Sequence, residues 1–152
     1  MFFSKFSPTG SKDKEEPELT LFEELAKLDL LYDPYPWKAE HWQQLSKSED
    51  EALFLLAQQE IIGWAVFKLI PSDSLAHLLK FLILPDFRKK GHGQILLKNA
   101  LSELQSLNYL KFYLEVEKNN NAISLYQKAG FRAIHEIPHF YGQGRNAIAM
   151  TR

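Results

Sequence analysis

The sequence predicts an α/β (α+β) fold in which a mixed sheet carries helices on its faces. Apolar runs of strand length alternate with segments of helical periodicity through the middle of the chain, and its end is rich in strand-type segments. A length of 152 residues suits a single domain. Residues 7–18 are mostly Ser, Pro, Gly, Lys, Asp and Glu, which predicts a flexible tail over residues 1–18 and one domain over residues 19–152.

Two helices are predicted before the first strand. Apolar residues recur at helical spacing from Leu21 to Leu28, which indicates a helix over about residues 19–30. The two prolines of YDPYPW cannot continue that helix, and residues 38–47 then form a short second one. We expect Trp37 and Trp42 to pack this second helix onto the core.

The rest of the chain predicts strands and helices in alternation. The expected elements are strands over residues 52–57 and 61–70 joined as a hairpin, a strand over 75–84, a helix from about residue 93, a strand over 110–116, a helix over 121–130, and strands over 131–137 and 146–152. Pro85 closes the third strand, and Gly130 is placed as the stop of the last helix. The helix from about residue 93 has one apolar stripe, formed by Leu97, Ala100, Leu101 and Leu104.

Charge and composition exclude several classes of protein. Lys and Arg number 18 and Asp and Glu 19, which argues against a protein that mainly coats nucleic acid or an anionic membrane. No apolar run reaches the roughly 20 residues of a membrane span, and the first residues make a poor signal peptide. Without cysteine there is no disulfide, thiolate nucleophile or Cys-based zinc site. We therefore expect a cytoplasmic protein with no direct nucleic-acid partner and no membrane partner.

We predict no metal site. His135 and His139 are the pair that invites one, but two residues that lie four apart on a strand are far from each other in space. No third ligand is obvious in the sequence.

The segment RKKGHGQ, from Arg88 to Gln94, places three cations and two glycines at the start of a predicted helix. The first N–H groups of a helix have no internal partners and carry the positive end of the helix dipole. Glycines there allow a ligand to approach the backbone closely. A pyrophosphate is the natural ligand of such a turn, although a surface turn with solvated cations is the alternative.

A second motif follows this turn along the chain. The first motif, R-x-x-G-x-G, is formed by Arg88, Gly91 and Gly93, and the second, N-x-x-A-x-x-L-Y-x-x-x-G-F, runs from Asn119 to Phe131. Together they resemble the GNAT superfamily of acetyl-CoA-dependent N-acetyltransferases. YPWKAEHW, LEV and HFYGQGRNAIAM are similar to segments of its ribosomal-protein-alanine N-acetyltransferases. The resemblance implies a GNAT-like mixed, mainly antiparallel sheet flanked by helices on both faces.

The resemblance also implies that acetyl-CoA is the co-substrate, and it indicates which residues would bind it. The third strand would pair its backbone with the pantetheine arm, and a plain buried strand is compatible with that role. Asn119 would cap the last helix and contact the cofactor. Asn120 is the alternative, because the segment after the LEV glutamate is one residue shorter than in the resembling subfamily. The implied cofactor-binding residues are Phe81, Leu82, Ile83, Arg88, Lys89, Lys90, Gly91, His92, Gly93, Gln94 and Asn119.

Glu115 and Tyr126 are the catalytic candidates. The side chain of Glu115 points away from the face of its two strand neighbours, and in the resembling subfamily the LEV glutamate accepts the proton of the amine. An exposed strand carboxylate is the alternative, and Glu117 is a rival base because it shares that face. The phenol of Tyr126, with a pKa near 10, would protonate the departing thiolate, although a packing role on the sheet fits as well.

The expected acceptor is an N-terminal α-amine. Its pKa near 8 leaves roughly a tenth of the molecules neutral at pH 7, whereas about one lysine amine in a thousand or fewer is neutral. The resemblance suggests a protein N-terminus, such as that of a ribosomal protein, in a groove bordered by the YDPYPW segment and the loop around Tyr141, Gly142 and Gly144. The acidic segment SEDE, residues 48–51, would suit a basic protein. The alternatives are a small-molecule amine or a lysine as acceptor, and a non-catalytic acyl-CoA-binding regulatory module.

Overall fold

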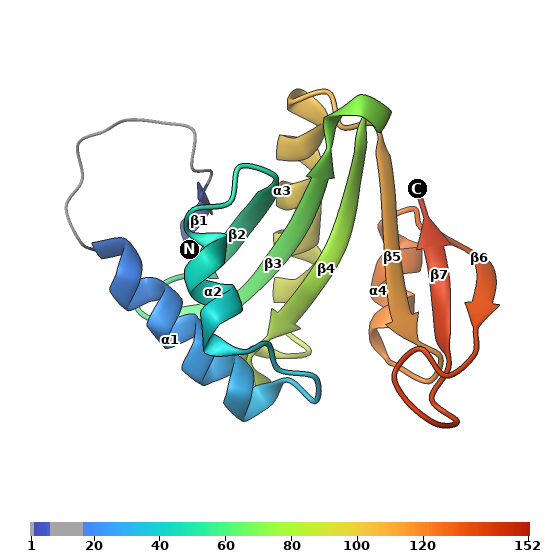
Figure 1. Ribbon diagram of the computed structural model, residues 1–152, viewed down its shortest axis with the longest axis horizontal. Coiled ribbons are helices and arrows are strands. Elements are labelled where there is room, and N and C mark those ends of the chain that lie inside the picture. The colour runs from blue at the N-terminus through green and yellow to red at the C-terminus, as the bar shows by residue number, and fades with distance from the viewer. Residues whose placement is uncertain (1, 7–16) are drawn as a thin grey trace.

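The sheet is mixed and mainly antiparallel, as predicted. A computed structural model describes residues 2–6 and 17–152, with side chains from Thr20 onward. In that part seven strands form one sheet in the order β1-β2-β3-β4-β5-β7-β6 (Figure 1), and every strand pair is antiparallel except β4–β5. The strands are β1 (Phe2–Phe6), β2 (Glu51–Ala57), β3 (Ile61–Ile70), β4 (Leu75–Ile83), β5 (Lys111–Glu117), β6 (Arg132–Ile137) and β7 (Ala147–Thr151).

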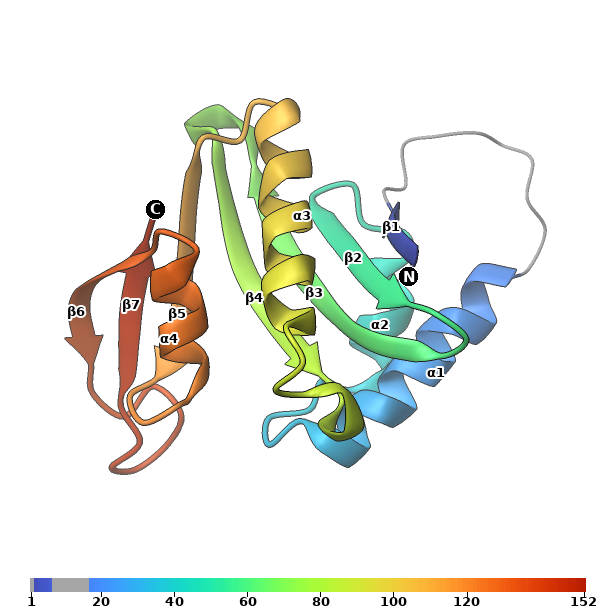
Figure 2. The same cartoon turned by 180° about the vertical axis from the view of Figure 1, so that it is seen from behind.

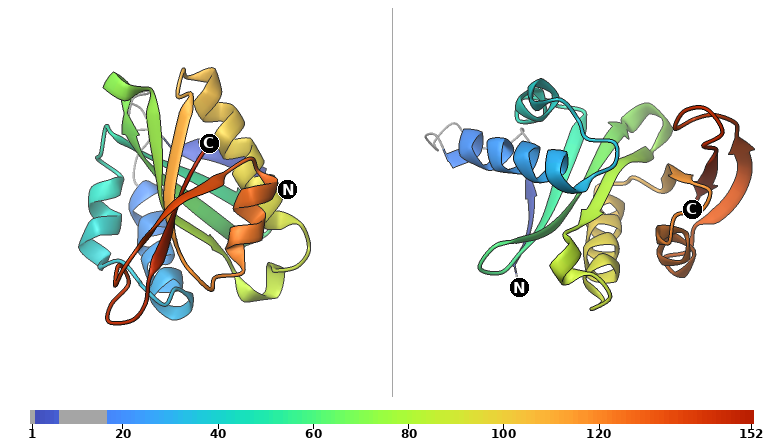
Figure 3. Two further views of the ribbon diagram at one scale, coloured as in Figure 1. Left: turned by 90° about the vertical axis from the view of Figure 1, so that its right-hand side faces the viewer. Right: turned by 90° about the horizontal axis from the view of Figure 1, so that it is seen from below.

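Helices cover both faces of the sheet, so this prediction is also confirmed (Figure 3). They are α1 (Pro17–Tyr32), α2 (Ala39–Leu45), α3 (His92–Ser106) and α4 (Ala122–Lys128). Helices α1 and α2 pack on one face around buried Leu25, Trp42 and Trp64. Helices α3 and α4 pack on the other, where the predicted stripe of α3 is buried. No helix in the described residues is long and apolar enough to cross a membrane.

Strand β1 was not predicted. It pairs antiparallel with β2 at one edge of the sheet, with Phe2 opposite Ala57 and Phe6 opposite Leu53. It lies within the segment expected to be a tail, of which residues 1 and 7–16 are outside the described part. Helix α1 begins at Pro17, a position that proline favours because the first helical N–H has no intrahelical acceptor.

Strand β4 contains one residue more than its partner β3 at a β-bulge. Val66 pairs with Lys80 while the next residue, Phe67, pairs with Leu78, so Leu79 is the extra residue. A bulge reverses the alternation of side chains, and as a result Lys80 joins the face covered by α1 and α2.

Strands β4 and β5 separate at this bulge. Their parallel pairing runs from Leu75 and Lys111 to Leu78 and Leu114 and ends there. The two strands then diverge, with β3 still paired to β4 and β7 still paired to β5 (Figures 1 and 2). The edges of β4 and β5 that face each other beyond Leu78 and Leu114 are thus open to another backbone-like group.

Candidate active site

Glu115 lies where β4 and β5 separate, one residue beyond the last pair. Its side chain is on the α1–α2 face, opposite to buried Leu114, as the sequence predicted. The Oε2 atom of Glu115 lies 2.6 Å from Nε2 of His77 on β4. The carboxylate and the imidazole are only 15% and 26% exposed, so this pair is a partly buried acid–base couple.

Tyr113 completes the surroundings of this pair. Its ring meets the imidazole of His77 edge-on at 5.0 Å. Burial, and then the nearby Glu115 carboxylate, raise the pKa of the Tyr113 phenol. Tyr113 therefore stays protonated at neutral pH beside the carboxylate.

Glu117, the rival base, is held in an ion pair. Arg145 donates from Nε to Oε1 at 2.8 Å and from Nη2 to Oε2 at 3.1 Å, and the Tyr35 hydroxyl donates to Oε2 at 3.2 Å. The hydrogen bonds from Arg145 hold the pKa of Glu117 below its ordinary value. A carboxylate stabilised in its ionised form is a weak base, so the geometry favours Glu115 over Glu117.

Tyr35 and Tyr141 bring two loops together over β5. Their rings lie 4.8 Å apart, and Arg145 lies over the ring of Tyr35 at 4.9 Å. The hydroxyl of Tyr141 donates to the backbone oxygen of Glu115 at 3.1 Å. Burial and the nearby Glu115 carboxylate raise the pKa of Tyr141 to about 12. The two loops predicted to border an acceptor groove therefore meet beside Glu115.

Tyr126 lies on the other face of the sheet. It is 6% exposed, and its ring is 6.0 Å from the rings of both Phe81 and Phe131. Burial, and then the Tyr141 hydroxyl, raise the pKa of Tyr126 well above the range of a free phenol. Tyr126 is thus protonated at neutral pH.

Lys80 joins β4 to the segment between α1 and α2. Its Nζ donates to Asp29 and Asp33 at 2.8 Å each and to the backbone oxygen of Tyr35 at 3.2 Å. Asp29 also accepts N–H groups from Trp37 at 2.8 Å and Trp42 at 3.2 Å. As predicted, both tryptophans pack the second helix onto the core.

The turn before α3 has an open helix N-terminus. Gly91 adopts a φ of 84° and no side chain caps the helix. A Cβ atom added at Gly91 would meet no atom within 4 Å. Arg88 and Lys90 donate to the backbone oxygens of Ile83 and Asp86, both at 2.8 Å, and His92 contacts that of Phe87. These bonds shape the turn and leave room at the first amides of α3.

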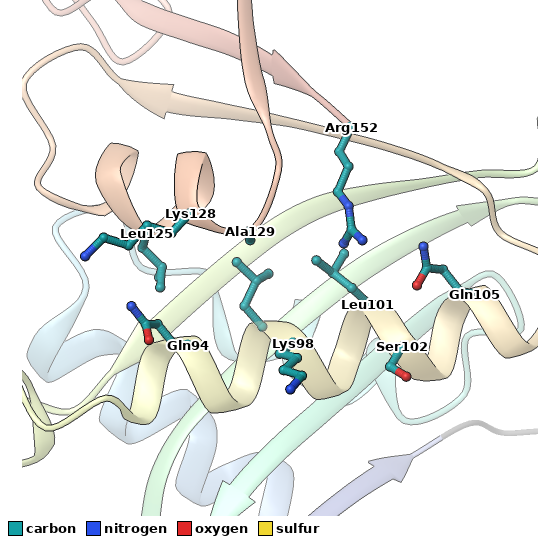
Figure 4. Close-up of a pocket in the computed structure, with 10 residues that line it drawn as sticks. Gln94, Lys98, Leu101, Ser102, Gln105, Leu125, Lys128, Ala129 and Arg152 are labelled. Carbon is teal, nitrogen blue, oxygen red and sulfur yellow. The ribbon is translucent and has the colours of Figure 1, made fainter.

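A cavity of about 560 Å³ lies between α3 and α4, and it begins beside this turn at Gln94 (Figure 4). Its cations are Lys98 of α3, Lys128 of α4 and Arg152, whose side chain reaches from the end of β7 toward α3. The lining residues are Gln94, Leu97, Lys98, Leu101, Ser102, Gln105, Leu125, Lys128, Ala129 and Arg152. The cavity therefore joins an apolar floor to a basic rim.

Contrary to the expectation, Asn119 does not cap α4. The N-cap is Asn121, whose side chain makes no capping hydrogen bond, and the Oδ1 atom of Asn120 accepts the N–H of Ala122 at 2.8 Å. The reason is that β5 extends to Glu117 and Asn119 lies in the exposed turn that follows it, two residues before the N-cap.

The structure brings several predicted site residues together and adds three. Glu115 and the loop residues Tyr35 and Tyr141 meet on one face, whereas Tyr126 and the turn before α3 lie on the other. His77, Lys80 and Arg145 were missed. A lysine inside the apolar run LAHLLKFLIL was a usable signal, because a buried lysine needs a partner. His77 depends on the register between β4 and β5, which the sequence does not show.

One of the two histidines that suggested a metal site has another contact. His139 accepts the N–H of Gly144 at its Nδ1, at 2.8 Å, and so shapes the loop between β6 and β7. Among the side chains described from Thr20 onward, no three acidic or histidine residues are grouped as metal ligands.

Comparison with known proteins places this geometry in a family. Residues 20–131 match the acetyltransferase (GNAT) family. An N-alpha-acetyltransferase of Sulfolobus acidocaldarius is 32% identical over 127 residues, which are 78% of this chain and 76% of that protein. The [ribosomal protein bS18]-alanine N-acetyltransferase of Haemophilus influenzae is 28% identical over 137 residues, or 86% of this chain and 90% of that one.

A solved structure shares the whole fold. It is an aminoglycoside 6′-N-acetyltransferase complexed with coenzyme A, with a TM-score of 0.80 and 16% identity, and the match covers 100% of this chain and 96% of that one. The family match spans most of the sequence and includes both motifs from which the resemblance was inferred. The chain belongs to the acetyltransferase (GNAT) family.

Proposed function

We propose that this protein transfers an acetyl group from acetyl-CoA to the α-amine of a protein N-terminus. The observation that carries the proposal is the pair formed by Glu115 and His77, 2.6 Å apart, at the point where β4 and β5 separate. A carboxylate that can act as a base lies there, beside a strand edge that could hold a thioester arm. Membership of the family supports acetyl-CoA as the donor.

The residues of the chain fit coenzyme A. The amides at the start of α3 lack a side-chain cap and face free space at Gly91, which suits a diphosphate. The open edge of β4 from Leu79 to Ile83 suits the amide groups of a pantetheine arm. The basic cavity that begins at Gln94 offers cations for further phosphate. Asn119 lies exposed in the turn after β5, and we propose that it also contacts the cofactor.

The proposed chemistry is a direct attack. The neutral amine nitrogen forms a bond to the thioester carbon, its proton passes to Glu115 directly or through water, and His77 supports the carboxylate. The carbonyl oxygen becomes an oxyanion, for which we assign the N–H of the bulged residue Leu79 as donor. The C–S bond then breaks, and the thiolate of coenzyme A takes a proton from Tyr126.

The charge of the site favours a cationic acceptor. Asp29, Asp33, Glu115 and Glu117 lie on the acceptor face with two fixed cations, Lys80 and Arg145. An α-amine arrives mostly as an ammonium group, with a pKa near 8. It loses one proton to water to become the nucleophile, and the second proton passes to Glu115 after the attack. The similarity to an N-alpha-acetyltransferase and to a [ribosomal protein bS18]-alanine N-acetyltransferase supports this acceptor. By the same similarity, a ribosomal protein in the cytoplasm is proposed as the partner.

A panel of acceptors tests the proposal. Release of free thiol from acetyl-CoA is measured with peptides that begin with Ala, Ser or Met, with lysine peptides whose N-terminus is blocked, and with polyamines. Turnover with free N-termini alone is the expected result. Turnover with the lysine peptides or polyamines alone would overturn the acceptor. Tight binding of acetyl-CoA without turnover on any amine would support a non-catalytic acyl-CoA-binding module.

A further inference from the structure

Lys80 is a buried lysine whose three donors all point at one segment of the chain. It is 5% exposed, and its ammonium group bonds Asp29, Asp33 and the backbone oxygen of Tyr35. An ammonium group has three N–H donors and no acceptor, so these contacts use its full capacity. Lys80 also lies over the ring of Trp37 at 5.1 Å.

The bonds that converge here fix the backbone between α1 and α2. Asp33 accepts the N–H of Tyr35 at 2.7 Å, and Asp29 accepts the N–H of Trp37 at 2.8 Å. Each carboxylate therefore holds both Lys80 and one loop amide. Two residues of the segment after α1 are thus tied to β4 through one side chain.

A buried ion cluster of this kind contributes little net stability to a fold. Taking charges out of water costs free energy, and apolar residues of similar size in place of a buried ion pair are often neutral or stabilising. Burial accordingly raises the pKa of Asp29. Unlike apolar packing, the hydrogen bonds of this ion cluster are directional, so they fix the orientation of the backbone between α1 and α2.

Lys80 lies in the part of β4 that is proposed to bind the acetyl donor. Lys80 lies between the bulged residue Leu79 and Phe81, in the stretch assigned above to the thioester arm. The loop that it holds carries Tyr35, whose hydroxyl donates to Glu117 at 3.2 Å and whose ring stacks on Tyr141. The side chain of Lys80 therefore joins β4, the strand proposed to bind the acetyl donor, to the loop with Tyr35, which is proposed to border the acceptor groove.

We propose that Lys80, with Asp29 and Asp33, is a positioning residue that sets the acceptor-binding loop relative to the acetyl-donor strand. The proposal rests on the proposed function, because it names what the loop is held for. Neither Lys80 nor Asp33 takes part in proton transfer. Their loss is expected to weaken acceptor binding and to leave donor binding unchanged.

The test uses Asp33→Asn in the full chain, because this variant keeps the buried pair of Lys80 with Asp29. The matched control is Asp50→Asn, which removes another carboxylate that accepts from a lysine, Lys68, on the exposed surface. With an N-terminal peptide as acceptor, Asp33→Asn should raise the KM for peptide about tenfold, the effect of one lost hydrogen bond to a charged group. The KM for acetyl-CoA and the values for Asp50→Asn should stay within about twofold of the wild type.

A double-mutant cycle separates positioning from stability. If Lys80 and Asp33 act through the loop, then the effects of Asp33→Asn and Tyr35→Phe on the peptide KM are not additive. Additive effects, or a lower melting temperature with an unchanged peptide KM, would overturn the positioning role. A wild type that acetylates no N-terminal peptide would overturn the proposed function and this role together. An active wild type matched by Asp33→Asn would overturn this role alone.

Discussion

Glu115 has the surroundings of a base, and Glu117, two residues later, has those of a structural carboxylate. One faces an imidazole at 2.6 Å, and the other is bound by a guanidinium through two oxygens. An imidazole can exchange protons near neutral pH, whereas a guanidinium cannot. Two carboxylates that lie two residues apart on one strand thus differ in their surroundings: Glu117 anchors a loop, and Glu115 is the one proposed as the base.

Replacement of Glu115 by Gln should lower kcat about a hundredfold or more, because the amide cannot accept the proton of the amine. The dissociation constant of acetyl-CoA, measured by calorimetry, should stay unchanged. Glu24→Gln, on the exposed side of α1, is the control and should keep wild-type kcat. An unchanged kcat in Glu115→Gln would remove Glu115 from the mechanism.

Tyr126→Phe should also lower kcat by about a hundredfold, because the departing thiolate loses its proton donor while the packing against Phe81 and Phe131 is kept. Tyr109→Phe changes another tyrosine packed against the same core and serves as the control. Single-turnover thiol release is the measurement. A wild-type rate in Tyr126→Phe would assign Tyr126 to packing alone.

The sequence predicted the face of the Glu115 side chain correctly, because alternation along a strand needs no partner information. It could not find His77 or Arg145 as neighbours. The contact of His77 depends on the register of β4 with β5, and that of Arg145 on the path of the loop between β6 and β7. The catalytic roles of Glu115 and Tyr126 stay predictions.

Helix α3 and the turn before it are the element that the sequence predicted best. A stripe of apolar residues and two glycines are local signals, and the structure buries the stripe and opens the N-terminus as expected. The bulge in β4 was not predicted, although His77 and Lys80 lie three residues apart in an otherwise apolar run and so break the two-residue period of a regular strand. Strand β1 was missed because a short strand next to a polar segment gives little pattern.

Gly91→Val should weaken acetyl-CoA binding by at least about tenfold, the effect of losing one hydrogen bond to a charged group. The new side chain would occupy the free space where the diphosphate is proposed to lie. The variant also strains the backbone, because Gly91 has a φ of 84°. Isothermal titration with acetyl-CoA is the measurement.

Gly144→Val is the matched control for that strain. Gly144 has a φ of 72° and also has no atom within 4 Å of an added Cβ, but it lies in the loop between β6 and β7. Both variants should lose about 1–2 kcal/mol of stability. Only Gly91→Val should lose cofactor affinity. Equal affinities would show that the phosphates bind elsewhere.

The whole molecule builds its site from both faces of one sheet. The separation of β4 and β5 lies between the face with α3 and α4, where the cofactor is proposed to bind, and the face with α1 and the two loops, where the acceptor is proposed to bind (Figure 3). The sequence predicted the class of fold and the family, and both are confirmed. It could not predict where the strands separate, because that follows from long-range pairing.

The loop between β6 and β7 is held by ionised carboxylates, which makes the stability of the molecule sensitive to acid. Asn146 and then Lys118 hold the pKa of Glu136 below its ordinary value of 4.5, and Arg145 does the same for Glu117. A carboxylate with a lowered pKa stabilises the fold above its ordinary pKa, and this contribution disappears as the pH falls through the folded-state value. Asp29 titrates in the opposite sense, because burial raises its pKa.

Glu136→Gln isolates the acid-sensitive part, because the amide imitates a carboxylate that has already lost its charge. The melting temperature of the variant should lie below that of the wild type at pH 7, and the difference should shrink toward zero as the pH falls below the ordinary glutamate value of 4.5. The contribution of Asp29 is the same in both proteins and cancels. Thermal melts from pH 7 to pH 3 measure the difference, with Glu24→Gln as a control that should match the wild type throughout. A difference that stays constant with pH would mean that the Glu136 contacts do not depend on its charge.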